Sequence, residues 1–393
     1  MSDGTKRRGF GTRAVHAGEA PDPVTGAAGV PIYQNATFAF RSAGQIDRFN
    51  NGEVPHYIYS RYGNPTVRCL ELKLADLEGA EDVLATASGM AAVTTVAFHY
   101  VAGGGHLVVS DSLYEATRDF FCRGIGDYGA TATAVDMTDF DAVRAAITPD
   151  TRALHVEPFS NPTLKIADID TLAAIAHEAG VDLIVDNTFL SPALYNPIEH
   201  GADIVIHSAT KYLSGHSNVI GGAIAGKAGA TVAMRERLAQ LGGIMAPQSG
   251  WILLNGVKTL ALRMAQHCEN GLAVAKVMAE HPAVETVHYP GLPSHPGHER
   301  AAEMTSGRFS GMVSVRLVEH ERARNVFLDA LTIPLKAVSL GDVASLVWPF
   351  DEDGVIRLSV GIEEAGDLVA DVTQALDAVS AQIVTNLGAP ASS

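Results

Sequence analysis

Short apolar runs alternate with amphipathic segments between about residues 65 and 250. The runs are rich in β-branched residues and predict the strands HLVVS, TATAVD, ALHVE, DLIVDN and DIVIHS. The segments between them have apolar residues at helical spacing, and one of them, DIDTLAAIAHEAG, ends on Gly180, which favours a helix end. This alternation predicts a mostly parallel sheet with helices on both faces, where ligands bind at the carboxyl ends of the strands.

The segments on either side of this region have different patterns. Residues 1–62 have many turn-forming residues and little periodicity, which predicts an extended arm that has no core of its own and packs on another body, such as a second subunit. Residues 249–281 have a long helical pattern, and shorter apolar runs and a last helical segment follow. We therefore expect a large domain over residues 63–254 and a smaller α+β domain over residues 255–393.

Composition narrows the class of protein. The 393 residues include 44 acidic and 28 basic ones, and the formal net charge of −16 argues against nucleic acid as a partner. The three cysteines are widely spaced and odd in number, which favours a reducing compartment. The N-terminal segment has no apolar signal core, and glycines and histidines break the long uncharged run over residues 83–109. We expect a cytoplasmic protein that does not span a membrane.

Polar residues gather where the predicted strands end. The motif ASGMAA follows the run DVLAT and places Ser88, Gly89 and Met90 at the start of a helical segment, where free N–H groups suit a phosphate. Asn161 and Asp186 follow two of the strands, and the next strand ends in SATK. An ordinary turn into a helix is the alternative for ASGMAA, and a helix or turn cap is the alternative for Asp186.

Together these groups fit a ligand that has a phosphate, a basic ring nitrogen and an aldehyde, and pyridoxal 5′-phosphate (PLP) has all three. The Lys211 amine of SATK can form a Schiff base with the aldehyde. Asp186 would keep the pyridine nitrogen protonated, so that the ring accepts electrons. The hydroxyls of Ser208 and Thr210 can hold the phosphate, and Tyr114 in SDSLYEATRDF is a candidate to stack on the ring.

Three rival motifs offer other chemistry. SATK also matches S-x-x-K of penicillin-recognising acyl enzymes, but the sequence lacks the S-D-N and K-T-G partners. GGAIAGKA nearly matches a phosphate-binding loop, but Ala228 replaces the metal-binding hydroxyl, so a glycine-rich strand or turn is favoured. His295 and His298 in HPGH could ligate a metal, but without a further ligand cluster we expect a polar surface loop and no metal.

A series of longer motifs occurs in order along the chain: YSRYGNPT, LEGAEDVLATASGMAA, VEPFSNPTL, DIDTLAAIAHEAGVDLIVDNTF, HSATKYLSGHSNVIGG, VKTLALRM, HYPGLPSHPGH and IRLSVGIE. In these motifs the sequence resembles the PLP enzymes of cysteine and methionine metabolism: cystathionine γ-synthases and γ-lyases, methionine γ-lyases and O-acylhomoserine sulfhydrylases. The resemblance covers nearly the whole chain. It implies the type I fold of PLP-dependent transferases, similar to aspartate aminotransferase.

The resemblance also implies how the cofactor is held. Lys211 would be the Schiff-base lysine, Asp186 would pair with the pyridinium nitrogen, and Tyr114 would stack on the ring and act in acid–base steps. The remaining cofactor ligands would be Tyr59, Arg61, Ser88, Gly89, Met90, Ser208 and Thr210.

Substrate binding and assembly follow from the same resemblance. Arg357 in IRLSVGIE would grip the substrate α-carboxylate in a bidentate fork, with Asn161 and Ser339 nearby. The alternative for Arg357 is a surface ion pair. Tyr59 and Arg61 would reach the phosphate of a neighbouring subunit, which implies a homotetramer built from dimers with shared active sites.

The implied activity is γ-elimination or γ-replacement on a sulfur-containing or O-activated homoserine-type amino acid. Val338, before Ser339 in LKAVSLGD, is similar to methionine γ-lyases. Two alternatives stay open: a β-eliminating cystathionine or cysteine lyase on the same scaffold, and a catalytically silent homologue that serves as a binding subunit.

The sequence departs from the family pattern at three places. Ala116 lies where methionine γ-lyases usually have a cysteine. Asn218 lies where the family usually has an aspartate. The loop that the family carries before Arg357 is almost missing, because VWPFDEDGVIRLSVG passes nearly directly to the arginine strand. Loops accept deletions readily, so we expect the same fold with a differently shaped substrate pocket, in which Trp348 and Phe350 replace part of the wall.

Overall fold

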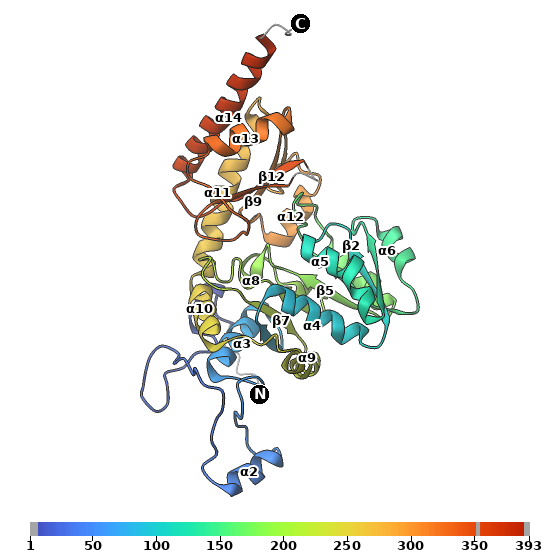
Figure 1. Ribbon diagram of the computed structural model, residues 1–393, viewed down its shortest axis with the longest axis vertical. Helices are drawn as coiled ribbons and strands as arrows, with labels where there is room; N and C mark the ends of the chain where they lie inside the picture. The colour runs from blue at the N-terminus through green and yellow to red at the C-terminus, as the bar shows by residue number, and fades with distance from the viewer. Residues whose placement is uncertain (1–6, 351–353, 389–393) are drawn as a thin grey trace.

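The structure, a computed structural model, describes residues 7–350 and 354–388 and contains two sheets (Figure 1). Seven strands form the large sheet: β1 (Asp82–Thr86), β2 (Gly105–Ser110), β3 (Ala130–Val135), β4 (Thr151–Val156), β5 (Asp182–Asp186), β6 (Ile204–His207) and β7 (Gly222–Gly226). Their order across the sheet is β1-β7-β6-β5-β4-β2-β3. Only β7 runs against its neighbours, so the predicted mostly parallel α/β sheet is confirmed.

The second sheet is smaller and mainly antiparallel. Its strands are β8 (Val284–His288), β9 (Met312–Leu317), β10 (Leu335–Lys336), β11 (Leu346–Phe350) and β12 (Val355–Ser359). Their order is β10-β11-β12-β9-β8, and only β10 and β11 are parallel. The small α+β unit expected in the C-terminal part is therefore present.

Helices cover both sheets. Those beside the large sheet are α3 (Pro65–Glu78), α4 (Gly89–Val101), α5 (Glu115–Asp119), α6 (Phe140–Ala146), α7 (Ile169–Glu178), α8 (Ser191–Leu194) and α9 (Ala228–Leu241). Those that lead to the small sheet and cover it are α10 (Pro247–Lys258), α11 (Leu260–Glu280), α12 (His298–Thr305), α13 (His320–Ala330) and α14 (Ala365–Gly388). Among the described residues, no helix combines the length and apolar character that a bilayer crossing needs.

The large sheet is buried on both faces because apolar residues occupy consecutive positions along its strands. Side chains of a strand alternate between the two faces. Accordingly Ile184 packs in the core on one face of β5, while Leu183 and Val185 pack in the core on the other. A sheet with two apolar faces needs helices on each, which explains the alternating sequence pattern.

The helix expected over residues 249–281 is two helices, α10 and α11, which meet at Thr259. The Arg263 guanidinium donates to the Gly256 carbonyl at 2.8 Å and to the Tyr212 carbonyl at 2.7 Å. These bonds satisfy carbonyl groups around the interruption. The apolar periodicity continues through it, so the sequence pattern does not reveal the break. The domain boundary expected after residue 254 falls inside α10.

The N-terminal arm contains two short helices, α1 (Phe10–His16) and α2 (Ala43–Asn50). The first is tied to the body, because the buried Lys73 amine donates to the carbonyls of Ala14 at 2.7 Å and Val15 at 3.0 Å. The second has no buried residue and lies far from the rest of the chain, at the bottom of Figure 1. The arm is therefore anchored at its start and projects beyond the body further along.

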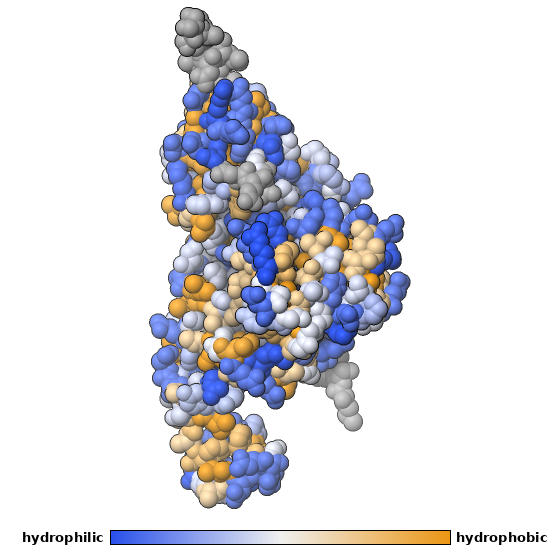
Figure 2. Space-filling model, turned by 45° about the vertical axis from the view of Figure 1, so that its right-hand side comes forward, coloured by the Kyte–Doolittle hydropathy of each residue, from blue (hydrophilic) through white to orange (hydrophobic). Residues whose placement is uncertain are grey.

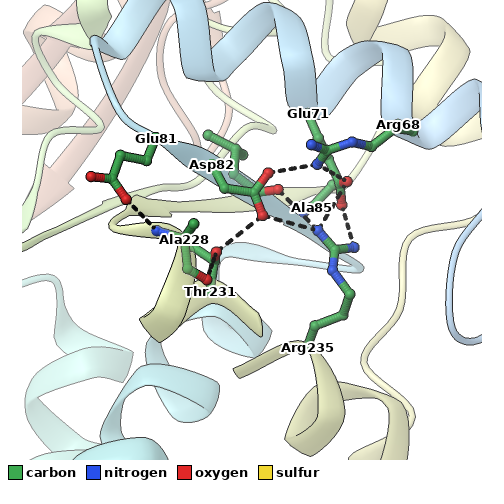
Figure 3. A network of polar contacts seen from close by, with 9 residues as sticks. Arg68, Glu71, Glu81, Asp82, Ala85, Ala228, Thr231 and Arg235 are labelled. Atoms are coloured by element: carbon green, nitrogen blue, oxygen red, sulfur yellow. Dashed lines mark hydrogen bonds and ion pairs between the residues drawn. The ribbon is translucent and has the colours of Figure 1, made fainter. Parts of the chain in front are cut away.

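A buried charge network joins α3, β1 and α9 (Figure 3). The Glu71 side chain, which is 2% exposed, accepts from both Nη atoms of Arg235 at 2.9 and 3.1 Å and from Arg68 at 3.0 Å. It also accepts from the Ala85 backbone N–H at 3.1 Å. Arg68 pairs in addition with Asp82 at 2.6 Å. Removing Glu71 would leave two guanidinium groups and a strand N–H without their central acceptor.

We predict that Glu71→Ala destabilises the protein, because breaking a buried ion pair costs about 3–5 kcal/mol. The apparent melting temperature should fall by roughly 5 °C. Glu71→Gln should lower the melting temperature less, because its amide oxygen can still accept from the Ala85 N–H. The control is Glu199→Ala, which removes an exposed pair with Arg7 and should change the melting temperature by less than about 1 °C. Equal shifts for Glu71→Ala and Glu199→Ala would contradict the structural importance of this network.

Candidate active site

A cavity of about 570 Å³ lies where the carboxyl ends of β1, β2, β4, β5 and β6 face the small sheet. Polar residues follow several of these strands. Parallel α/β sheets usually bind ligands at this edge, where the strands end. The cavity brings together most of the residues singled out from the sequence: Ser88, Gly89, Met90, Tyr114, Asn161, Asp186, Ser208, Thr210, Lys211, Ser339 and Arg357.

One corner of the cavity is the start of α4. The Ser88 hydroxyl caps the helix by accepting from the Ala91 N–H at 3.0 Å. Gly89 has no room for a side chain, because a Cβ there would lie 2.8 Å from the Ser208 Cβ. In the part of the chain that the structure describes, the N–H groups of Gly89 and Met90 have no hydrogen-bond acceptor. This corner has the free N–H groups that a phosphate needs.

Two hydroxyls flank the same corner. Ser208 lies beside Gly89, and its backbone N–H donates to the Thr188 hydroxyl at 2.8 Å. The Thr210 hydroxyl accepts from the Gly221 N–H at 3.0 Å and lies 3.3 Å from the Gly221 carbonyl. Since a hydroxyl proton rotates freely, the Thr210 proton can turn from that carbonyl to a phosphate oxygen.

Two carboxyl groups, of the buried Glu157 and the half-buried Asp186, lie on the large-sheet side of the cavity. Asp186 accepts from the Thr188 hydroxyl at 2.5 Å and from its N–H at 3.1 Å. Burial raises the pKa of Asp186, and burial together with the charge of Asp186 raises the pKa of Glu157 well above its ordinary value. Glu157 also accepts from the Tyr114 backbone N–H at 2.8 Å. A protonated ring nitrogen that enters the cavity would offset the cost of charging these groups.

Lys211 is a half-buried amine with one close partner. Its Nζ donates to the Ser339 hydroxyl at 2.8 Å. Burial and the nearby charge of Arg357 lower the pKa of Lys211 to about 8. Ser339 is held at φ 106°, a backbone conformation that non-glycine residues rarely adopt. A lysine with this pKa is partly neutral near physiological pH and is therefore a nucleophile and a base.

Arg357 lies deep in the site, on the small-sheet side. Its Nη1 donates to the Asn161 side chain at 2.6 Å and its Nη2 to the Ser339 carbonyl at 3.1 Å. Phe350 lies against it, with the ring centroid 4.7 Å from the guanidinium carbon. Burial lowers the pKa of Arg357 to about 10, so it stays a cation at neutral pH. Among the described residues it has no carboxylate partner, and at 6% exposure it is not part of a surface ion pair.

Tyr59 and Arg61 lie outside this cavity. The Arg61 Nη1 donates to the Ala239 carbonyl at 3.2 Å, and its guanidinium lies 4.7 Å from the Tyr62 ring centroid. Tyr59 is 41% exposed. Neither is among the described residues that line the cavity, and their action on a neighbouring subunit stays a prediction.

The rival motifs take ordinary structural positions. The motif GGAIAGKA contains the whole of β7 and leads into α9, so the expected glycine-rich strand is confirmed. The expected surface loop at HPGH is only partly right, because His295 is buried and its Nδ1 accepts from the Gly297 N–H at 3.0 Å. His298 contacts the Pro290 carbonyl through its Nδ1 at 2.8 Å. The described residues contain no cluster of three potential metal ligands.

Sequence reasoning missed Glu157 and Thr188. Glu157 directly follows β4, as Asp186 ends β5, so its position after a strand was a usable signal. Thr188 was hidden because its contact with Asp186 depends on the local turn. Trp348 and Phe350 line the cavity, in agreement with the expectation that they replace part of the wall formed by the family's missing loop.

The donor set fits PLP on the structure's own terms. The glycine cradle and free N–H groups suit its phosphate, the two carboxyl groups suit its ring nitrogen, and the low-pKa lysine suits its aldehyde. Comparison with known proteins points the same way: residues 11–349 match the family model of the Cys/Met metabolism PLP-dependent enzymes.

Individual relatives are similar along nearly the full chain. The L-methionine gamma-lyase of Pseudomonas putida is 40% identical over 96% of this chain and 100% of its own. The cystathionine gamma-synthase of Mycobacterium tuberculosis is 42% identical over 94% of this chain and 97% of its own. A solved structure of a putative O-acetylhomoserine (thiol)-lyase from Campylobacter jejuni, which contains N′-pyridoxyl-lysine-5′-monophosphate, is 31% identical with a TM-score of 0.89, covering 94% of this chain and 100% of that one.

Cavity, family model and full-length relatives agree, and this chain belongs to the PLP-dependent enzymes of cysteine and methionine metabolism.

Proposed function

We propose that this protein catalyses γ-elimination or γ-replacement on a sulfur-containing or O-activated homoserine-type amino acid. The observation that carries the proposal is the pairing in one cavity of the low-pKa Lys211 amine with the Arg357 cation, which has no carboxylate partner among the described residues. One group can move protons at the substrate, and the other can bind its carboxylate. The relatives named above act on this class of amino acid by their names.

Arg357 and Asn161 are the proposed carboxylate site. The 2.6 Å contact with Asn161 and the bond to the Ser339 carbonyl fix the plane of the guanidinium before a substrate arrives. A planar cation held in this way can donate two parallel hydrogen bonds to a carboxylate. Because the bonds to Arg357 come from both domains, the substrate would be held where the two sheets meet.

Lys211 and Tyr114 are the proposed acid–base groups. PLP, when bound, supplies the electron sink that stabilises negative charge on the substrate's α-carbon. Lys211 removes the α-proton when its amine is neutral. A second proton then leaves the substrate's Cβ, and Tyr114 gives a proton to the γ-substituent as its bond to Cγ breaks. With water, methionine would give methanethiol, 2-oxobutyrate and ammonia; with a thiol, the γ-substituent would be exchanged for a new thioether.

The arm supports a proposed assembly of dimers with shared active sites, paired into a homotetramer. Apolar side chains lie exposed along it, and Figure 2 shows apolar surface on the projecting lobe at the bottom. They are Ile32, Tyr33, Ile46, Ile58, Tyr59 and Tyr62. A second copy of the chain would cover this surface and place Tyr59 and Arg61 near the partner's phosphate corner. The free cysteines support a proposed cytoplasmic location.

A substrate panel tests the proposed reaction. We expect the holoenzyme to release 2-oxobutyrate from methionine or O-acetylhomoserine, or to form a thioether when a thiol is added. Lys211→Ala, with its folding checked by melting temperature, is the control and should give neither product. Pyruvate from cystathionine or cysteine as the main product would establish β-elimination instead. No turnover of any substrate by the wild type would indicate a catalytically silent protein.

The lowered pKa of Lys211 predicts how the apoprotein captures PLP. Only the neutral amine attacks an aldehyde, and at pH 8 about half of the Lys211 amines are neutral, against about 0.3% for a lysine at the ordinary 10.5. The rate of capture, measured as cofactor fixed to the Lys211 peptide by borohydride, should therefore rise with pH and level off above about pH 8. A rate that still rises steeply at pH 9.5 would show that the pKa is not lowered.

The carboxylate site predicts the effect of Arg357→Ala. Loss of two charge-assisted hydrogen bonds of about 1.5 kcal/mol each should raise KM for the amino acid roughly 100-fold. Arg357→Lys should give an intermediate KM, because it keeps the charge and loses the fork. Steady-state kinetics across the panel measures both, and a KM within twofold of the wild type would place the carboxylate elsewhere.

A further inference from the structure

The β11–β12 hairpin presents one face to the cavity. Trp348 lies opposite Arg357 in the antiparallel register, so their side chains point to the same side of the sheet. Phe350, two residues after Trp348, points to that side as well. All three line the cavity that contains Lys211. The strand pair that supplies the proposed carboxylate site thus also supplies an aromatic wall next to it.

The mouth of the cavity has more apolar surface than this hairpin alone provides. Trp348 is 39% exposed, Val338 is 63% exposed and Ile220 is 67% exposed. Val338 and Ile220 also line a second cavity of about 550 Å³, whose wall includes Leu335. Because Val338 and Ile220 line both cavities, the second cavity provides space next to the first. Apolar side chains left exposed in a concave site gain free energy when an apolar group covers them.

The charges around both cavities are the second observation. Among the described residues that line them, the cations are Lys211 and Arg357, and both have roles above. Besides Glu157 and Asp186, which face the proposed position of the ring nitrogen, the acids are Glu115 in the first cavity and Asp342 in the second. A neighbour's Arg61, in the proposed dimer, would be neutralised by the phosphate. A second carboxylate at the far end of a substrate would therefore meet two acids and no free cation.

We propose that the γ-substituent of the preferred substrate is uncharged, apolar and larger than an ethyl or methylthio group, and that it packs against Trp348. This inference rests on the proposed function, since it places the substrate carboxylate at Arg357. With the carboxylate held there, the γ-substituent extends along the hairpin face toward Trp348 and Val338. A substituent with the charged amino-acid end of cystathionine would be disfavoured by the same surface.

Binding of unreactive analogues tests the proposal without turnover. The chain has two tryptophans, Trp251 and Trp348, so Trp251→Phe leaves Trp348 as the only indole. Trp251 lies in α10, donates to the Val30 carbonyl at 3.1 Å and lines neither cavity. The ligands are norleucine, homophenylalanine and 2-aminoadipate. Their γ-substituents are attached to Cγ by carbon–carbon bonds, which the enzyme cannot break by elimination. The three ligands carry an ethyl, a phenyl and a carboxymethyl γ-substituent, respectively.

We expect saturable changes in Trp348 fluorescence in the Trp251→Phe holoenzyme. Homophenylalanine should bind about tenfold more tightly than norleucine, and 2-aminoadipate at least tenfold more weakly than norleucine. By calorimetry, Trp348→Ala should lose about tenfold in affinity for homophenylalanine and less than threefold for norleucine. Trp348→Phe should keep most of the affinity, and Trp251→Phe should behave like the wild type. Equal affinities for the three ligands, or no selective loss in Trp348→Ala, would overturn the proposal.

The outcomes separate this inference from the proposed function. If the enzyme turns over methionine but shows no preference among the analogues, the aromatic wall does not select the substrate and only this inference fails. If the substrate panel gives no product while homophenylalanine still binds against Trp348, the reaction assignment fails and the binding surface stands. If Trp348→Ala is unstable by melting temperature, Val338→Ala removes another part of the same apolar wall, and it should likewise lose more affinity for homophenylalanine than for norleucine.

Discussion

Two cationic side chains, Lys211 and Arg357, line one cavity and share Ser339 as a hydrogen-bond partner, and the chemistry of the site depends on this arrangement. Burial and mutual repulsion lower the pKa of Lys211 to about 8, while burial lowers that of Arg357 to about 10. Lys211 can therefore lose its proton, whereas Arg357 stays charged. Ser339 joins them, because its hydroxyl accepts from Lys211 and its carbonyl accepts from Arg357. A strained backbone at Ser339 holds both contacts at once.

The two sheets divide the work between them. The large sheet supplies the helix N-terminus at Gly89, the half-buried carboxyl of Asp186 and the lysine, all at the ends of parallel strands that meet at one edge. The small sheet supplies Arg357 from β12 and the aromatic residues from β11. The site exists only where these two bodies meet, with α10 and α11 forming the connection in the chain (Figure 1).

Strands β11 and β12 form one wall of the cavity. The hairpin brings Trp348 and Phe350 directly beside the arginine. Phe350 covers the guanidinium and helps to keep it away from solvent, while Trp348 faces the open part of the cavity. This wall therefore comes from the small sheet, while the candidate cofactor residues come from the large sheet.

The amino-acid sequence by itself determined the alternating strands and helices, because periodicity records which faces are buried, and it determined the candidate cofactor residues, because their chemistry is local to strand ends. Only the tertiary structure decided what Glu157 contacts, where the helix breaks at Thr259, and that His295 is buried. It also decided that Lys211, Ser339 and Arg357 meet, and so set the pKa of the lysine. Burial and electrostatic coupling arise between segments far apart in the chain, and a linear pattern carries no record of those distances.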